Sequence, residues 1–145
     1  MRRTSALLRR RIVGTPPSDQ VGDSGSELIV TGLSMHHIYC DRKIEAIDSY
    51  ASGLNLTGLY KLGKPGRVVV EGRRTNVEQY VSVVRRWRWQ KIAVMGTYAV
   101  DERRFAAFTE AMTSAEFEQL MLTAELKSLH DDMVRSYKAP RPILK

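Results

Sequence analysis

The sequence predicts an α+β fold, in which an antiparallel four-stranded sheet carries two helices on one face and a further helix follows at the C-terminal end. Two observations predict it. The strongest local pattern in the 145 residues is a β-hairpin around Gly63-Lys64-Pro65-Gly66. The second observation is that one strand-like segment and one segment with helical periodicity lie on each side of this hairpin. The order strand, helix, strand, strand, helix, strand is a split β-α-β-β-α-β arrangement, which is called ferredoxin-like.

The hairpin is expected over residues 56–71. Its first half alternates between two faces, as an extended segment does, and the three valines of Val68–Val70 are typical of a central strand covered on both faces. Pro65 and Gly66 fit the second and third positions of a type II turn, because proline fixes φ and glycine allows the positive φ of the third position. Lys64 is therefore expected at the exposed tip.

The first and last strands of the arrangement flank this hairpin. The ordered domain is expected to begin near Glu27, and two extended segments follow it, Leu28–Thr31 and Met35–Tyr39, separated by Gly32. The second of them is interpreted as the first core strand, with alternate residues on its two faces. The last strand is expected at Lys91–Met95.

Two helices connect these strands to the hairpin. The first should begin at Asp41, as its N-cap, and end near Ser52, where Gly53 fits the left-handed residue after a helix. The second opens with Thr75–Glu78, whose hydroxyl and carboxylate fit a capping box. Apolar side chains recur at helical spacing in both. They are Ile44, Ile47, Ala51 and Leu54 in the first helix and Val77, Tyr80, Val81 and Val84 in the second.

The C-terminal third has the longest helical pattern. Residues 96–112 are expected to form a short helix or a loop over the sheet, and residues 113–137 a single helix that opens with a capping box at Thr113–Glu116. It carries two apolar stripes, so it packs across the open face of the sheet or contacts a partner. The stripes are Phe117, Leu120, Met121 and Ala124, and Leu122, Leu126, Leu129 and Met133.

The chain divides by composition into a basic arm and linker (1–26), the ferredoxin-like domain (27–100), a helical extension (101–137) and a tail (138–145). Residues 1–13 hold five arginines and no acid. This composition fits a mitochondrial presequence, and equally a basic arm that contacts nucleic acid or an import receptor. The linker that follows is rich in glycine, proline and serine.

The net charge of +7 is unevenly distributed. Residues 27–100 hold eleven lysines and arginines against six acids, whereas residues 101–137 hold four against eight. A basic sheet domain indicates a polyanionic partner, although a solvated surface of mixed sign explains it equally well. The single cysteine excludes an internal disulfide framework, and no apolar run is long enough to cross a bilayer, so no membrane partner is expected.

Six pieces of the sequence, in this order and spacing, resemble a known family. They are His36-His37-Ile38-Tyr39, the Lys43-containing helix, Leu54-Asn55-Leu56-Thr57-Gly58, Gly63-Lys64-Pro65-Gly66, Val70-Glu71-Gly72 and Trp89-Gln90-Lys91-Ile92. Together they look like the C-terminal domain shared by the pre-mRNA-processing factor three and RWD-domain-containing protein two, and are closer to the second. The likeness covers about residues 33–95.

The resemblance implies a ferredoxin-like fold, a small nuclear ribonucleoprotein partner, RNA binding, a link to pre-mRNA splicing and a nuclear location. The chain holds no RWD domain and no long N-terminal region like that of the splicing factor, so the splicing role need not carry over. A mitochondrial or cytoplasmic location remains the alternative.

The candidate RNA-binding residues are basic groups around the hairpin and the second helix, with an aromatic ring to stack on an unpaired base. They are Lys64, Arg67, Arg73, Arg74, Arg85, Arg86 and Arg88, with Lys91 beside them, and Tyr60, Tyr39 or a tryptophan as the ring. These cations are expected to converge on one surface. For Trp87 and Trp89, the core is favoured over stacking on RNA.

No catalytic or metal motif is found. His36 and His37 are adjacent and would point to opposite faces of a strand, and Cys40 adds only an incomplete ligand set. Gly63–Gly66 joins two strands and does not have the spacing of a phosphate-binding P-loop. We therefore expect no catalytic residue, no metal and no cofactor.

The sequence thus predicts a non-catalytic module that binds RNA or belongs to a ribonucleoprotein. Two alternatives stay open. One is a protein-interaction adaptor that uses the 113–137 helix to dock a partner. The other is a component of a mitochondrial ribonucleoprotein.

Overall fold

The structure, a computed structural model, describes residues 27–89 and 91–138, with side chains described as far as Arg135. In chain order its elements are β1 (Leu28–Met35), α2 (Asp41–Gly53), β2 (Thr57–Lys61), β3 (Gly66–Arg73), α3 (Arg74–Arg85), β4 (Ile92–Ala99), β5 (Phe108–Ala111), α4 (Ser114–Thr123) and α5 (Lys127–Lys138). The predicted arm and linker, with the presequence alternative, and residues 139–145 of the tail lie outside the described residues. No helix within the described ranges is long and apolar enough to cross a membrane.

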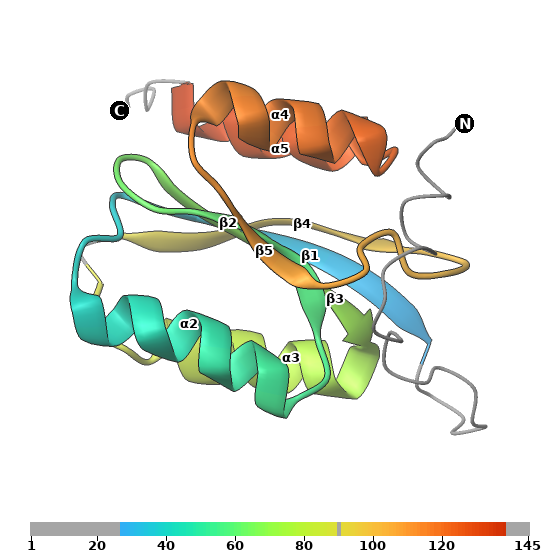
Figure 1. Ribbon diagram of the computed structural model, residues 1–145, viewed down its shortest axis with the longest axis horizontal. Helices are drawn as coiled ribbons and strands as arrows, with labels where there is room; N and C mark the ends of the chain where they lie inside the picture. Colours follow the sequence, from blue (N-terminus) through green and yellow to red (C-terminus); the bar gives the residue numbers. More distant parts are fainter. Residues whose placement is uncertain (1–26, 90, 139–145) are drawn as a thin grey trace, which may run out of the picture.

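The sheet has five strands in the order β4-β1-β3-β2-β5 (Figure 1). β1 pairs antiparallel with both β3 and β4, and β2 and β3 form the predicted hairpin. The first six elements therefore confirm the split order. β5 was not predicted, and it pairs parallel with β2, with Gly58 opposite Phe108. The sheet is mixed and five-stranded, so the prediction of four antiparallel strands is wrong.

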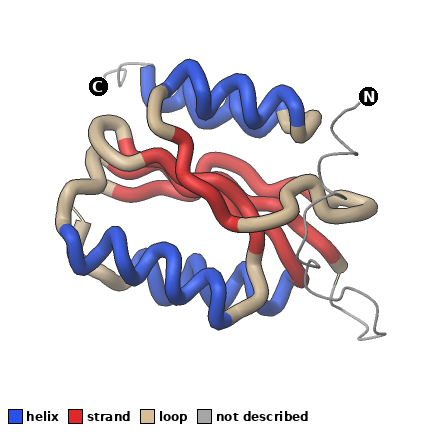
Figure 2. The backbone as a smooth tube through the Cα atoms, viewed as in Figure 1, coloured by secondary structure: helices blue, strands red, loops and turns tan. Residues whose placement is uncertain are grey.

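Helices cover both faces of the sheet. Figures 1 and 2 show three layers, with α2 and α3 on one face and α4 and α5 on the other. β3 lies in the middle, where Val68 and Val70 join the core under α2 and α3, and Val69 joins the core under α4 and α5. All three are fully buried, which confirms the prediction from the valine run. Each buried valine contributes about 1.5–3 kcal/mol relative to an exposed one.

β1 differs from the strand that the sequence predicts. It runs through Gly32 and ends at Met35, whereas the predicted strand began at Met35. Gly32 interrupts the hydrophobic pattern because α5 lies directly above it. A Cβ atom at this position would come within 2.6 Å of Met133 Sδ and 3.1 Å of Leu129 Cδ1. The glycine is a site of close packing, not a boundary between segments.

The hairpin turn also differs from the type II turn that the sequence predicts. Gly66 is already in β3, opposite Met35, and the positive φ of 88° belongs to Gly63. Lys61 stabilises the loop, because its Nζ donates to the carbonyl oxygens of Leu62 at 2.9 Å and Pro65 at 3.3 Å. Lys64 is exposed at the tip, as predicted.

The ends of α2 and α3 correct the predicted caps. Asp41 is the first helical residue and Cys40 is the N-cap, while the left-handed residue after α2 is Asn55, at φ 56°, rather than Gly53. α3 begins at Arg74, one residue before the predicted capping box, with no side-chain cap. Both apolar stripes are confirmed, because their residues are buried or packed against the core under α2 and α3.

The predicted 113–137 helix is two helices. Thr113 caps α4 as predicted, since its Oγ1 accepts from the Glu116 N–H at 3.0 Å. The chain then turns at Glu125, whose φ is 62°. Arg104 stabilises this break, because its Nη1 donates to the Ala124 carbonyl at 3.0 Å. The two apolar stripes predicted for residues 113–137 belong to the core under α4 and α5, except for Leu122, which is 39% exposed.

A buried carboxylate holds the loop between β4 and β5 in place. The side chain of Glu71, in β3, is fully buried and accepts hydrogen bonds from the backbone N–H of Arg104 at 2.6 Å and of Phe105 at 2.9 Å. The Thr57 hydroxyl donates to it at 3.1 Å, and Arg103 Nη1 in turn donates to that hydroxyl oxygen at 3.0 Å. The loop therefore leads into β5 from a fixed position.

The packing at Gly32 gives a stability prediction. Gly32→Ala should lower the free energy of unfolding by about 1–3 kcal/mol, because overpacking a filled core forces side chains off their rotamers. Gly53→Ala is the matched control, since a Cβ atom there meets nothing within 4 Å. Urea unfolding measures both. Equal effects of the two substitutions would contradict close packing at Gly32.

Glu71 gives a pH prediction. Burial raises the pKa of Glu71 from 4.5 to about 7, although its backbone hydrogen bonds act in the opposite direction. The folded state then keeps this proton to higher pH than the unfolded state, so stability should fall as pH rises from 5 to 8. The unfolding free energy of the wild type minus that of Glu71→Gln should decrease by about 2–3 kcal/mol over this range. Urea unfolding at several pH values measures it, and a constant difference would refute the raised pKa.

Candidate nucleic-acid interface

The topology brings three connections to one end of the sheet. Met35, which ends β1, lies opposite both Gly66, which begins β3, and Ile92, which begins β4. The connection from β1 to α2, the hairpin loop and the connection from α3 to β4 therefore meet at this end. We call their described residues, 36–43, 62–66, 86–89 and 91, the basic end.

Backbone hydrogen bonds tie the three connections together. The His36 N–H donates to the Lys91 carbonyl at 3.1 Å. Ile38 and Gly63 exchange two hydrogen bonds, at 2.9 and 3.0 Å, so the hairpin loop lies directly beside the segment that follows β1. Lys43 Nζ donates to the Arg88 carbonyl, which joins the first turn of α2 to the end of the α3–β4 connection. The basic end is therefore a structured surface, although it consists mostly of loops.

The basic end is strongly cationic. Its sequence holds six lysines and arginines against one acid, Asp41. The six are Arg42, Lys43, Lys64, Arg86, Arg88 and Lys91. Partial burial and then the charge of Lys64 lower the pKa of His36, and His37 and Lys91 act in the same direction. His36 therefore lies within the field of cations from two of the three connections.

One aromatic ring of the basic end is open to solvent. Tyr39 is 60% exposed, and its ring stacks on His37 with the centroids 4.9 Å apart. Trp89 is instead half-buried, with its Nε1 donating to the Val84 carbonyl at 2.8 Å and Lys43 Nζ 4.3 Å from its ring centroid. Trp87 and Trp89 both pack against the core, as predicted. Tyr39 is therefore the ring that can receive a base.

The structure divides the candidate residues named from the sequence. Lys64, Arg86 and Arg88 are exposed at the basic end, together with Lys91. Arg85, the last residue of α3, is also exposed, and it lines a groove between α3 and β4. These five cations surround the end of the sheet where the three connections meet.

The other candidates lie elsewhere. Arg67 is only 5% exposed and lies under α4, with its guanidinium 5.9 Å from the Phe117 ring centroid. Arg73 and Arg74 lie at the far end of β3, roughly 23 Å from Gly66 at the rise of an extended strand. Arg74 Nε bonds Glu27 at 2.7 Å, and its Nη1 bonds Glu78 at 3.3 Å. The expectation of one surface for all these cations is therefore met only in part.

Tyr60 does not offer its ring to a ligand. It is 8% exposed, and it stacks on Phe108 of β5 with the centroids 5.0 Å apart. The sequence does not predict β5, so it does not predict that Phe108 of this strand packs on the ring. Of the two tyrosines considered, the structure leaves only Tyr39 accessible.

Sequence reasoning missed Arg42 and Lys43. Both lie in the first turn of α2, where their backbone N–H groups lower the pKa of the exposed Cys40 thiol. A signal for them was present. In a split β-α-β-β-α-β fold the hairpin tip and the start of the first helix lie at the same end of the sheet, so this pair could have been grouped with Lys64.

Comparisons with known proteins agree with this fold and name a family. Among solved structures, BlrP1 BLUF aligns with a TM-score of 0.57 at 15% identity, covering 84% of this chain and 100% of that one. BlrB, a BLUF protein in its dark state, aligns with a TM-score of 0.53 at 16% identity, covering 79% and 96%. The photo-activated state of BlsA has a TM-score of 0.53 at 12% identity, covering 81% and 99%. At these identities the likeness shows a shared fold alone.

The family match is more specific. Residues 32–134, well over half of the chain, match the family described as the C-terminal domain of the small nuclear ribonucleoprotein Prp3. The match includes all the described strands and helices except the beginning of β1 and the end of α5. The narrower likeness to the RWD-protein branch stays a prediction. The chain belongs to the Prp3 C-terminal domain family.

Proposed function

We propose that this chain is a non-catalytic module that binds single-stranded RNA through the basic end and acts within a ribonucleoprotein in the nucleus. The observation that carries the proposal is the exposed Tyr39 ring, which belongs to one of the three connections whose cations form the basic end. The family supports the choice of partner, since its description names a small nuclear ribonucleoprotein.

The cations of the basic end suit a phosphate backbone. Lys64, Lys91 and Arg42 are exposed and lie on different connections, so each can contact a different phosphate along an extended strand. Each phosphate neutralised on a single strand releases counterions and steepens the salt dependence of binding by about 0.7. Contacts of this kind position RNA without reading its sequence.

The exposed ring favours a single strand over a duplex. In a duplex the faces of the bases are covered by their neighbours, whereas an unpaired base can stack on an aromatic side chain. Tyr39 already has His37 on one side, which holds the ring in place, and its exposure leaves room for a base. Stacking of this kind contributes about 1–3 kcal/mol for each base.

Charge removal at the basic end tests the proposal. The double variant Lys64→Ala/Lys91→Ala should weaken binding of a single-stranded RNA by about tenfold and reduce the slope of log K against log salt by about 1.4, since two phosphate contacts are lost. Fluorescence anisotropy titrations at several salt concentrations measure both quantities.

The matched control is Lys127→Ala/Arg135→Ala, which removes the same charge from exposed positions of α5. It should leave the slope unchanged. Equal losses in the two double variants would show attraction by net charge rather than an RNA site at the basic end. No binding of the wild type at low salt would refute the proposed function.

A further inference from the structure

β4 forms an edge of the sheet and carries no charge or proline to protect it. Its eight residues, Ile92–Ala99, contain neither of these two devices against edge-to-edge pairing, and a third device, a bulge, is confined to Met95 in the middle of the strand. Val94 and Tyr98 are each 37% exposed. The opposite edge is different, because β5 is only four residues long and carries Glu110. β4 therefore has the length and composition of a strand that accepts another strand.

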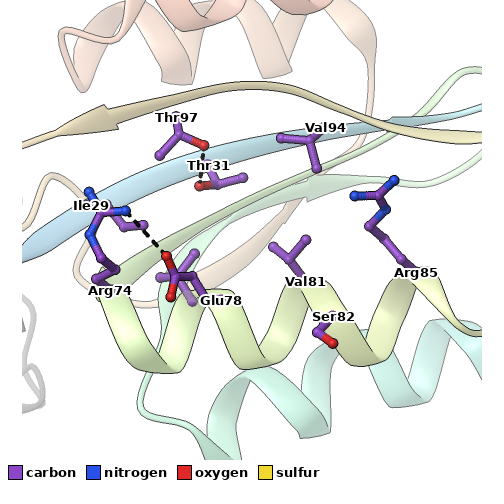
Figure 3. Close-up of a pocket in the computed structure, with 10 residues that line it drawn as sticks. Ile29, Thr31, Arg74, Glu78, Val81, Ser82, Arg85, Val94 and Thr97 are labelled. Carbon is purple, nitrogen blue, oxygen red and sulfur yellow. Dashed lines mark hydrogen bonds and ion pairs between the residues drawn. The ribbon is translucent and has the colours of Figure 1, made fainter.

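A groove runs along this edge. It has a volume of about 560 Å³ and lies between α3 and the strands β1 and β4, with Val81 and Val94 on its walls (Figure 3). The hydroxyls of Thr31 and Thr97, 3.0 Å apart, lie on the strand side of it. A strand added beside β4 would place alternate side chains over this groove.

The two ends of β4 carry opposite charges. Lys91 precedes the strand, and Asp101 follows it after Val100. Both side chains are exposed. An antiparallel partner with the same sequence would bring its own Asp101 beside Lys91 and its own Lys91 beside Asp101. This complementarity distinguishes a second copy of the chain from an unrelated peptide.

We infer that two copies of this chain associate through antiparallel pairing of β4 with β4, which joins their sheets around a two-fold axis. The interface is isologous, as expected for a dimer, because the same strand serves both copies. The axis lies near Met95 and Gly96, where β4 holds one residue more than β1, since Gly32 pairs with Gly96 and Leu33 with Val94. Val94 and Thr97 of each copy then face each other beside the groove.

Sedimentation velocity over about 1–100 μM, a range that covers typical weak to moderate dimers, tests the inference. The wild type should shift with concentration from the monomer mass to twice that mass. Val94→Lys, which places a charge on the edge, should raise the dissociation constant by about tenfold or more. Thr109→Lys on β5 is the matched control at the other edge, and it should leave the dimer unchanged. Circular dichroism at low concentration checks that both variants fold.

If Val94→Lys does not fold, an exchange of the charges at Lys91 and Asp101 still tests the inference. These two residues lie outside β4, so substituting them leaves the strand itself unchanged. Lys91→Asp and Asp101→Lys should each weaken the dimer, and the double variant should restore it. A monomeric wild type across the whole range would overturn the inference. So would a dimer that resists Val94→Lys and both single exchanges, or one that Thr109→Lys dissociates, since it would form through another face.

Discussion

The burial of β3 on both faces is the constraint on which the rest of the structure depends. Val68, Val69 and Val70 are all fully buried, so helices must cover the sheet from both sides. α2 and α3 meet this requirement on one face, as they would in any split β-α-β-β-α-β unit. The other face needs α4 and α5, and the chain reaches them only after β5 has extended the sheet beyond β2. The C-terminal helices are therefore part of the core.

β3 also fixes the position of the loop through which the chain passes to the second helical layer. Glu71 lies in β3 beyond the valines and binds the backbone of Arg104 and Phe105, while Arg104 holds the end of α4. One buried carboxylate thus connects the centre of the sheet with the loop that begins the second helical layer. A carboxylate without partners would be too costly there, and its hydrogen bonds offset much of that cost.

The placement of the basic end follows from the scaffold. Because β1 ends where β3 and β4 begin, three connections that are distant in sequence share one surface, and the sheet with its two helical layers supports it. Binding residues often lie on loops that a rigid core positions in this way. The β4 edge meets the basic end at Lys91, and Arg85 lines the groove beside it. Lys64 and Val94 each belong to one surface alone, so either proposal can fail without the other.

The sequence predicted those elements whose position is set by local periodicity and composition. The valine run identified the central strand, the stripes identified α2 and α3, and Thr113 with Glu116 identified the start of α4. It could not predict the features that depend on contacts between residues distant in sequence. The sequence pattern predicts a break at Gly32 because it does not show that Met133 packs above this residue. β5 is a four-residue strand whose pairing with β2 has no local signal.

The candidate site was predicted less completely than the fold. Lys64, Arg86 and Arg88 are exposed, as a phosphate contact requires, because charged residues in turns and at helix ends are rarely buried. Arg67 is not at the predicted exposed site because its side chain lies on the face of β3 that α4 covers. Tyr60 is not there because its ring packs against Phe108 of β5. Arg42 and Lys43 needed a topological argument, since they are distant in sequence from the hairpin.

Ultraviolet cross-linking of a single-stranded RNA to the protein, with mass spectrometry of the cross-linked residues, tests the central claim most directly. We expect cross-links at Tyr39 and its neighbours in residues 36–43, and at residues 62–66, 86–89 and 91, all within one surface. Cross-links concentrated on α4, α5 or the far end of β3, with none at Tyr39, would contradict it.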